Sequence, residues 1–470
     1  MNEPPQNNAG LRCVVIGAGL AGMAAAVALE SAGVNVTLIE ARRTAGGRAG
    51  SFVHPETGET LDNCQHVLLG CCTNLIDFYR RIGALDRIRF ERTIHFLDGR
   101  GNRHDLWGIA ELPAPLHLGV ATLLFGALNN SERLALGQAM LAMMYIGREG
   151  RQKIADQSFG DWLTQHNQPS SLIDKIYQPL ITGALNEDCR KASAAYAIQV
   201  FQDSLLSNSK GYMLGLPKCP LGELYANLPC RDFRLGQRVS ELTMTADRRH
   251  VNGVKLTDGQ AIPVDAVVLA TNYDAVRRFV NAQDDPRVAP LEYLSSTPIL
   301  GAHLFFDSPV LPWSHVAFLE GPLQWLFKKD SEGRSVHGVI SAATDWVNRD
   351  RDEMAELFAN QVRQTLPQAK DAKLLRSVIV IEKRATFAPV PGVDQWRPTQ
   401  SPIPGGIENL YFAGDYTQTG WPATMEGAVR SGYLAAQSIV GRRFLVDDLP
   451  MQWPSKFMAT FGTIPQNTDD

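Results

Sequence analysis

Residues 11–22 read LRCVVIGAGLAG, and this stretch decides the fold. The apolar, β-branched run before the glycines predicts a buried parallel strand, and the residues from Ala24 to Ser31 predict a helix after them. In this order Gly17 makes a tight turn, Gly19 lets the backbone approach a pyrophosphate, and Gly22 lets helix and strand pack closely. The phosphate is expected at the N-terminus of that helix.

A second predicted strand, residues 34–39, ends on Glu40. An acidic residue at this distance after a glycine turn typically binds the ribose hydroxyls of a dinucleotide. A carboxylate there would repel a 2′-phosphate, so the bound adenosine should lack one. A structural glycine turn in some other α/β protein is the alternative, but the order of strand, turn, helix, strand and acid favours a dinucleotide. NAD and FAD both use this turn.

The composition excludes several other classes of protein. With 470 residues, 44% hydrophobic and 20% charged, the chain is expected to be globular, with one large or two ordinary cores. A formal net charge of −4 offers no concentrated attraction to phosphate backbones, so nucleic acid is not an expected partner. The seven cysteines suggest no disulfide scaffold and no secretory signal is recognisable, so a reduced, cytoplasmic setting is expected.

No metal site is predicted. Cys64, Cys71 and Cys72 lie close together, but a zinc site needs four ligands and no second short-spaced set follows. Buried, reduced thiols are the expected interpretation of these three residues.

Any membrane contact is expected to be peripheral. No apolar stretch reaches the roughly twenty residues that cross a bilayer. Residues 112–125, LPAPLHLGVATLLF, are short and contain two prolines, so they could dock on a membrane but not cross it. The polar residues 1–10 are predicted to be a loose tail.

The residues after Glu40 favour FAD over NAD. Residues 41–48, ARRTAGGR, contain a glycine pair and arginines that extend the phosphate contacts beyond the first turn. This run resembles the extended dinucleotide motif of the flavin amine oxidase and carotenoid desaturase superfamily. The resemblance implies that Arg48 lies by the pyrophosphate, with Arg42 and Gly47 in the same site. Standing alone, the arginines would be interpreted as a solvated basic loop.

A second part of the flavin site is predicted near the other end of the chain. Residues 409–412, NLYF, predict a short strand that leads into Gly414 and Asp415, and residues 425–432, MEGAVRSG, follow. This order resembles the C-terminal flavin motif of the superfamily. Gly414 allows close backbone approach, Asp415 can accept hydrogen bonds from the ribityl chain, and a helix starting near Met425 can point its N-terminus at the pyrimidine edge of the flavin.

Between these motifs, residues 233–271 alternate as strands around a hairpin signal, TDGQ at 257–260. The apolar run at 267–271 predicts a strand that returns to the nucleotide sheet. The resemblance implies that Val239 contacts adenine through its backbone, although it could also be an ordinary strand residue.

The flavin motifs are scattered, so the predicted fold is an α/β, Rossmann-like FAD-binding domain interleaved with a mixed α+β substrate domain. The FAD-binding domain is predicted to comprise residues 1–75, 212–290 and 385–445. The substrate domain is predicted to comprise residues 76–211 and 291–384, including a helix over 131–146 and a strand over 301–307. Residues 446–470 are predicted to be a C-terminal tail.

Five further segments narrow the resemblance: DNCQHVLLGCC at 62–72, TPI at 297–299, LFFD at 304–307, QWLF at 324–327 and KRATF at 383–387. With them the chain, from about residue 11 to 440, is similar to the hydroxysqualene dehydroxylase family of hopanoid and isoprenoid biosynthesis. Cys64 departs from the family pattern, which has glycine, so a less permissive backbone is expected there. The resemblance implies FAD-dependent reductive removal of the hydroxyl from hydroxysqualene to give squalene.

That chemistry needs a proton donor, because hydroxide is a poor leaving group. His66 is the first candidate, since an unperturbed imidazole titrates near neutral pH, and Asp62 and Glu382 are alternatives. A histidine in an apolar run is, however, more often a satisfied core residue. The implied partners are an apolar isoprenoid substrate and a reductant that reloads the flavin, whose identity the sequence leaves open.

An apolar substrate also needs an entrance. Met140, Met143 and Met144 fall on the predicted helix at 131–146 and are expected to be core, although soft side chains of this kind would suit an isoprenoid. Together with residues 112–125 they form the hypothesised entrance.

Three other functions share this scaffold. A carotenoid or phytoene desaturase would run oxidatively over a similar apolar channel. An amine oxidase is less favoured, because Gly301 aligns where that family commonly has a lysine. A non-catalytic escort of prenyl lipids would have lost its flavin motifs, whereas the motifs around Gly414 and Met425 are intact here.

Overall fold

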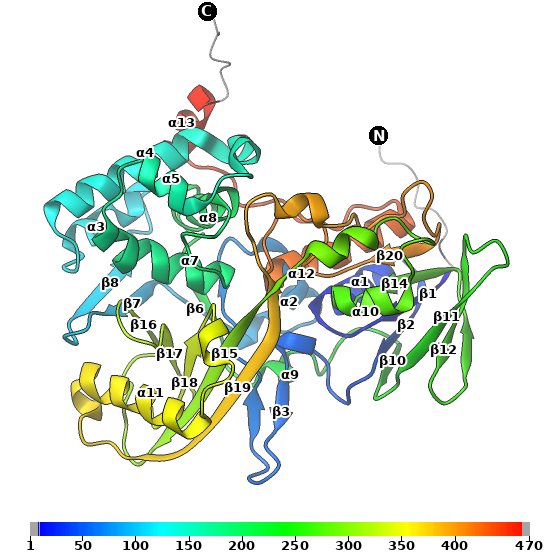
Figure 1. Ribbon diagram of the computed structural model, residues 1–470, viewed down its shortest axis with the longest axis horizontal. Coiled ribbons are helices and arrows are strands. Elements are labelled where there is room, and N and C mark those ends of the chain that lie inside the picture. The colour runs from blue at the N-terminus through cyan, green and yellow to red at the C-terminus, as the bar shows by residue number, and fades with distance from the viewer. Residues whose placement is uncertain (1–7, 9, 463–470) are drawn as a thin grey trace, which may run out of the picture.

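A parallel sheet of five strands carries the glycine turn (Figure 1). The computed structural model describes residues 8 and 10–462, so the tail predicted at 1–10 lies mostly outside the described residues. Each neighbouring pair is parallel, so the carboxyl ends of all five strands meet at one edge, where such sheets bind ligands. In sheet order the strands are β10 (Asp232–Leu235), β2 (Asn35–Glu40), β1 (Arg12–Ile16), β14 (Ala266–Leu269) and β20 (Leu410–Phe412).

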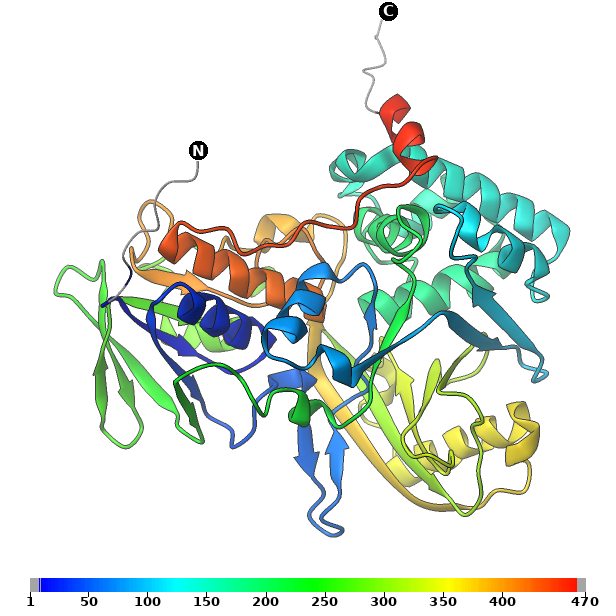
Figure 2. The same cartoon turned by 180° about the vertical axis from the view of Figure 1, so that it is seen from behind.

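Two helices pack together against this sheet (Figure 2). Helix α1 (Leu20–Ser31) is rich in alanine and buried along most of its length, and α12 (Met425–Val440) crosses it closely. A Cβ atom at Gly432 would lie 2.2 Å from the carbonyl oxygen of Ala21, so only glycine allows this approach. The strands and the helix that the sequence predicts around the glycine turn are therefore confirmed.

The segment between the motifs forms an antiparallel sheet of β11 (Val239–Met244), β12 (Val251–Leu256) and β13 (Ala261–Pro263). The predicted TDGQ turn joins β12 to β13. Its glycine, Gly259, has a φ of +93°, which glycine adopts without strain. The hairpin prediction is confirmed, and the next strand, β14, returns to the parallel sheet as expected.

The other half is built on a sheet of seven strands, which contains the strand predicted at 301–307 (Figure 1). Helix α11 (Arg351–Thr365) packs on it, and its buried Phe358 and Val362 join the core of this half. In sheet order the strands are β19 (Leu374–Phe387), β15 (Ser296–Phe306), β18 (Ser335–Ile340), β17 (Trp325–Lys328), β16 (His315–Phe318), β7 (Thr93–Leu97) and β8 (Arg103–Trp107).

A group of helices completes this half and encloses a second apolar core. The predicted helix at 131–146 lies within α4, which starts with a capping box between Asn129 and Glu132. The principal helices are α3 (Gly119–Leu124), α4 (Asn130–Gly150), α5 (Phe159–Gln165), α7 (Gln178–Leu185) and α8 (Ala194–Phe201).

Residues 73–91 lie with the nucleotide half, past the boundary expected at residue 75. Helix α2 (Thr73–Arg81) packs against α12, and β6 (Ile88–Glu91) pairs with β9 (Leu214–Pro217), which also pairs with β5 (Leu68–Leu69). A hairpin of β3 (Ser51–Val53) and β4 (Thr60–Asp62) projects nearby.

Residues 446–462 do not form the predicted tail. After α12 the chain crosses to the other half and forms α13 (Ser455–Gly462), which packs on α4 (Figure 2). The carbonyl oxygen of Leu449 accepts a hydrogen bond from Arg148 at 2.9 Å, and the Gln452 side chain accepts one from the Ala114 N–H at 2.9 Å. These contacts join residues far apart in sequence, so local pattern did not predict them; residues 463–470 lie outside the described chain.

Candidate active site

One cavity of about 960 Å³ extends from the carboxyl edge of the parallel sheet into the substrate half. Gly22 and Asp62 are not part of its lining, whereas His66 and Glu382 are. Ten of the eleven residues predicted to bind the cofactor line it: Gly17, Gly19, Glu40, Arg42, Gly47, Arg48, Val239, Gly414, Asp415 and Met425.

The glycines of the turn have three different surroundings. Gly17 has a φ of +105°, and a Cβ atom there would lie 2.6 Å from the carbonyl oxygen of Ala270. At Gly22 a Cβ atom would lie 1.9 Å from the carbonyl oxygen of Gly17, so this glycine brings α1 against β1. At Gly19 a Cβ atom would meet nothing within 4 Å, which leaves open space at the N-terminus of α1. A phosphate can approach the backbone there.

Glu40 links the glycine turn to the segment that follows β2 through hydrogen bonds to the backbone. Its carboxylate accepts hydrogen bonds from the N–H groups of Ala18 and Arg42, each at 2.8 Å. These bonds fix the turn relative to the end of β2. Each carboxylate oxygen has a further lone pair for a ribose hydroxyl.

Gln237 is a site residue that sequence reasoning missed. Its N–H donates to the carbonyl oxygen of Glu40 at 3.0 Å, and its side chain lines the cavity. Its Oε1 atom is buried and has no hydrogen-bond partner among the described residues. Val239, 7% exposed, follows at the start of β11. The position of Gln237 just after β10, at the carboxyl edge of a parallel sheet, is the signal that could have identified it.

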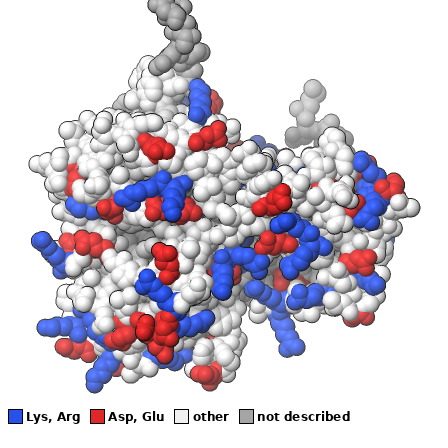
Figure 3. Space-filling view, viewed as in Figure 1, with Lys and Arg blue, Asp and Glu red and all other residues white. Residues whose placement is uncertain are grey.

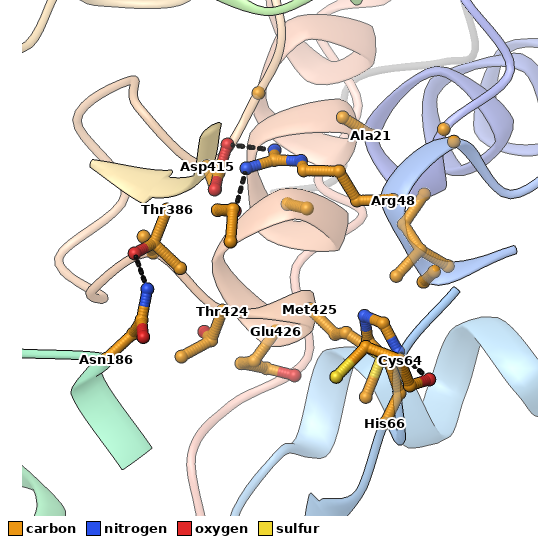
Figure 4. Close-up of a pocket in the computed structure, with 18 of the residues that line it drawn as sticks. Ala21, Arg48, Cys64, His66, Asn186, Thr386, Asp415, Thr424, Met425 and Glu426 are labelled. Atoms are coloured by element: carbon orange, nitrogen blue, oxygen red, sulfur yellow. Dashed lines mark hydrogen bonds and ion pairs between the residues drawn. The ribbon is translucent and has the colours of Figure 1, made fainter. Parts of the chain in front are cut away.

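Arg48 and Asp415 connect the N-terminal and C-terminal motifs (Figure 4). Arg48 Nη2 donates to Asp415 Oδ1 at 2.6 Å, and Nη1 donates to the carbonyl oxygen of Ala385 at 2.5 Å. The Asp415 side chain is 8% exposed and the Arg48 side chain 39%. The guanidinium thus lies at the open edge of the cavity, where it can also meet an anion.

The N-terminus of α12 faces the cavity. The hydroxyl of Thr424 accepts a hydrogen bond from the Gly427 N–H at 3.1 Å and caps the helix. Met425, the first helical residue, lines the cavity as the sequence predicts. The positive end of the helix dipole therefore stabilises negative charge in the cavity.

These groups fit a flavin dinucleotide. The open space at Gly19 and the N-terminus of α1 suit a pyrophosphate, and the unpartnered Oε1 of Gln237 offers an acceptor to a ribose or adenine N–H or O–H donor. Arg48 supplies a cation, and the N-terminus of α12 suits the electron-rich edge of a flavin.

Asp62, one of the two alternatives to His66, lies outside the cavity lining and is held in an ion pair. It is 3% exposed, and its carboxylate accepts hydrogen bonds from Lys329 Nζ at 2.9 Å and the Leu221 N–H at 2.8 Å. Burial alone would raise the pKa of Asp62, but Lys329 and these hydrogen bonds lower it below its usual value. The group therefore stays ionised at neutral pH and holds β4 in place.

His66 lines the cavity as a neutral imidazole. Its Nδ1 lies 3.0 Å from the carbonyl oxygen of Cys64, and its Nε2 has no partner among the described residues. Burial lowers the pKa of His66. Glu382, on β19, also lines the cavity and is half-buried, and its carboxylate accepts a hydrogen bond from the Arg384 N–H at 3.2 Å. Both residues remain candidates for proton transfer.

Cys64 also lines the cavity, as a protonated thiol. Burial raises the pKa of Cys64 to about 12. Its φ is not positive, so the backbone there does not require the glycine of the family pattern. All seven cysteines lie in the described part of the chain, and none forms a disulfide.

The part of the cavity in the substrate half has mainly apolar walls. Trp325 and Phe327 stack there with ring centroids 5.8 Å apart. A wall of this kind suits a long hydrocarbon chain. The other apolar lining residues of this half are Ile94, Leu106, Leu180, Val200, Phe201, Leu205, Ile299 and Val339, and Val67, Leu69, Tyr212 and Leu214 line the cavity beside them.

The residues of the hypothesised substrate entrance do not line the cavity. Neither residues 112–125 nor Met140, Met143 and Met144 line the cavity. Met143 and Met144 are 0% and 4% exposed and belong to the apolar core, which is the position expected for them from the sequence. The helix that carries them, α4, packs against α8 and α13.

The apolar wall is interrupted by buried polar side chains. Asn186 donates to Thr386 Oγ1 at 2.9 Å (Figure 4). Gln199, on α8, and Asp203, four residues further along the chain, also line the cavity. Sequence reasoning missed all three, because each lies in an apolar or mixed segment without a motif.

Gly301 has no room for a lysine. A Cβ atom there would lie 2.6 Å from Nε2 of His337, the partner of His303 across β15 and β18. The imidazole of His337 fills the space that a side chain at this position would need.

A family model described as flavin containing amine oxidoreductase matches residues 20–440. The chain belongs to this family. This chain is therefore an oxidoreductase with the fold of the flavin-containing amine oxidoreductases, and its cofactor is FAD.

Curated relatives of this chain include a desaturase and a dehydroxylase. A 15-cis-phytoene desaturase of Synechococcus elongatus is 25% identical, over 92% of this chain and 96% of its own. A hydroxysqualene dehydroxylase of Rhodopseudomonas palustris is 29% identical, over 91% of this chain and 97% of its own.

Solved structures of the family share the fold. Wild-type putrescine oxidase bound to putrescine superimposes with a TM-score of 0.68 and 16% identity, covering 92% of this chain and 100% of that one. Cyclohexylamine oxidase from Brevibacterium oxydans gives a TM-score of 0.65 and 17% identity, covering 93% and 99%. The predicted α/β fold, a Rossmann-like FAD-binding part with a mixed α+β part, is thereby confirmed.

Proposed function

We propose that this FAD-dependent oxidoreductase removes the hydroxyl of hydroxysqualene reductively and releases squalene. The cavity carries the proposal: a long apolar wall continues from the flavin cradle and is interrupted by buried polar side chains at Asn186, Gln199 and Asp203. A linear polyene with one polar group matches such a wall. The relative from Rhodopseudomonas palustris, aligned over nearly its whole length, supports this choice.

Reduced FAD, when bound, supplies hydride to the carbon that loses the hydroxyl, while the electron pair of the C–O bond leaves with the oxygen, which takes one proton and departs as water. The chain must deliver that proton, exclude bulk water and hold the substrate. Trp325, Phe327 and their apolar neighbours exclude water. His66 is the first candidate for the proton, because it lines the cavity with a free Nε2.

The decisive assay is anaerobic incubation of the holoenzyme, reduced with dithionite, with hydroxysqualene. We expect squalene as the product by gas chromatography and mass spectrometry. A phytoene desaturase is the second candidate, favoured by the relative from Synechococcus elongatus. Formation of a coloured, desaturated product from phytoene under oxidising conditions, with no squalene from hydroxysqualene, would replace the proposal with that function.

The role of His66 predicts a pH dependence. Because burial lowers the pKa of His66 below its usual value, the imidazolium is scarce at neutral pH and increases as the pH falls. Single-turnover dehydroxylation should therefore accelerate as the pH falls from 8 towards 6. In His66→Ala this rise should disappear and the rate should fall by about 10²-fold or more, with FAD content unchanged.

His54, on the projecting hairpin, provides the matched control. His54→Ala should keep both the rate and the pH profile. An unchanged rate for His66→Ala at saturating substrate would end the proposed role and leave Glu382 as the remaining candidate.

A further inference from the structure

Asp203 lies in the wall of the apolar cavity with one carboxylate oxygen free. Its side chain is 5% exposed, and Oδ1 accepts hydrogen bonds from Arg148 Nε at 3.0 Å and Arg151 Nη2 at 2.9 Å. Oδ2 accepts no hydrogen bond from any residue that the structure describes, yet it is not fully enclosed by protein atoms. Asp203 is one of the residues that line the cavity, so a ligand in the cavity can supply the donor that Oδ2 lacks.

Two irregular helical segments build this position. Asp203 lies in a π-helical turn, Gln202–Leu206, that continues α8, and α4 is interrupted opposite it at Gly147, where φ is +62°. The Gln202 amide donates to the carbonyl oxygens of Met143 and Gly147, at 2.6 and 3.1 Å. Its oxygen in turn accepts from Arg151. The kink therefore places two guanidinium groups on Oδ1, and π-turns of this kind are often found at functional sites.

The second oxygen of Asp203 lacks a donor from the described chain. Leu205, Leu69 and Cys71 line the cavity on the neighbouring walls, so Oδ2 faces an environment with few donors. Buried polar atoms in folded proteins are nearly always hydrogen-bonded, and exceptions concentrate at binding sites. The two arginines balance the charge of Asp203 but leave its second oxygen for a donor from outside the chain.

We propose that Oδ2 of Asp203 binds the hydroxyl of the substrate, an alcohol on an otherwise apolar polyene. The inference rests on the proposed function and deepens it. The alcohol O–H donates to Oδ2, so the carbon that bears the hydroxyl lies one bond beyond the bound oxygen. The carboxylate is then also close to the positive charge that develops on this carbon as the C–O bond breaks. A hydrocarbon has no donor for Oδ2, so the site selects the alcohol.

Binding measurements on the oxidised holoenzyme test this selection. Hydroxysqualene, its methyl ether and squalene are titrated in one detergent, and the change in flavin absorbance gives each Kd. The wild-type enzyme should bind hydroxysqualene about tenfold or more tightly than squalene, and the ether, which cannot donate, no better than squalene. Equal binding of the alcohol and its ether overturns the inference without any variant.

Variants locate the effect. In Asp203→Asn the preference for hydroxysqualene over squalene should fall by about tenfold. In the matched control Asp174→Asn it should persist, because the Asp174 side chain is 64% exposed and does not line the cavity. FAD content and thermal unfolding are recorded for both variants. An Asp203→Asn enzyme that keeps the wild-type preference overturns the inference and leaves Asp203 with a structural role only.

The same samples separate this inference from the proposed function. If the reduced wild-type enzyme forms squalene but Asp203→Asn keeps its preference, the inference fails and the function stands. If the wild-type enzyme forms no squalene, the proposed function fails. If the preference for the alcohol is nevertheless lost in Asp203→Asn, recognition of the alcohol by Asp203 is supported.

Discussion

Gly19 and Gly22 belong to one turn, but a methyl group would have opposite consequences at the two positions. At Gly19 it would enter open space, with φ at −75°, a value that alanine adopts freely. At Gly22 it would overlap the carbonyl oxygen of Gly17. We therefore expect Gly19→Ala to fold normally and bind FAD at least about tenfold more weakly, because the methyl group occupies the phosphate site.

Gly22→Ala should instead lower the free energy of unfolding of the apoprotein by about 1–3 kcal/mol. Chemical denaturation of the apoproteins and fluorescence titration with FAD separate the two effects. A Gly19→Ala protein with the affinity of the wild type would show that the pyrophosphate does not approach this backbone.

The residues of the flavin cradle could be predicted because their chemistry is local. Gly17 and Glu40 are 23 positions apart. Gly17 follows the first strand directly, and one helix and a second strand lead from it to Glu40. The ion pair of Asp62 could not be predicted, because its partner, Lys329, is 267 positions away. Gln237 and Asp203 were missed for the same reason, since their role depends on what folding brings next to them.

At the scale of elements, Glu426 holds α12 against α2. Its carboxylate accepts hydrogen bonds from the N–H groups of Asn74 and Leu75, at 3.2 and 2.7 Å, and from Arg430 at 2.7 Å. The side chain is completely buried. It therefore caps the N-terminus of α2 from another helix and keeps the cavity end of α12 in position.

We expect Glu426→Gln to lower the free energy of unfolding by about 1–3 kcal/mol, because a neutral amide leaves Arg430 and the two N–H groups poorly matched. Urea denaturation of the holoenzyme measures the change. Glu241→Gln, on the exposed face of β11, is the control and should leave stability unchanged. Equal stability of the two variants would contradict the capping role of Glu426.

Elements with their own periodicity were predictable, and elements held by distant contacts were not. β1, β2, α4 and the β12–β13 hairpin follow from alternation, helical spacing and a turn signal. Helix α13 has no such signal, because two prolines precede it and its stability comes from packing on α4. The π-turn after α8 is likewise invisible in the sequence, since it depends on the kink at Gly147.

At the scale of the whole molecule, exposed apolar residues gather on the helices of the substrate half. In Figure 3 charged side chains crowd the lower left and the right, whereas the top of α4 is mostly white. None of the described helices is long and apolar enough to cross a membrane. We use the name exposed apolar face for the exposed apolar residues of α3, α4, α13 and the segment before α3: Leu112, Leu116, Val120, Leu123, Leu124, Leu134, Leu141, Tyr145, Phe457 and Phe461.

This face gives the expectation of peripheral membrane contact a definite surface. Patches of this kind mark contact with lipid or protein, and the proposed substrate, a hydroxylated polyene, would partition into bilayers. Leu123 and Leu124 are each 70% exposed. We expect Leu123→Glu with Leu124→Glu to reduce co-sedimentation with phosphatidylcholine vesicles by about tenfold or more, because two charged groups would enter the acyl boundary.

Leu375→Glu is the matched control, because Leu375 is 67% exposed on β19, outside the exposed apolar face. It should sediment with vesicles as the wild type does. If the double variant binds vesicles unchanged, the face does not rest on lipid.

The contact between Arg48 and Asp415 has a consequence for synthesis of the protein. Its partners are 367 positions apart, and α12, which packs on α1, follows Asp415 in the chain. On a ribosome the glycine turn emerges early, but the complete flavin cradle cannot close until Met425 has been translated. A chain that stops before β20 lacks both Asp415 and the helix that covers α1. We therefore expect stable binding of FAD only after translation has passed the start of α12.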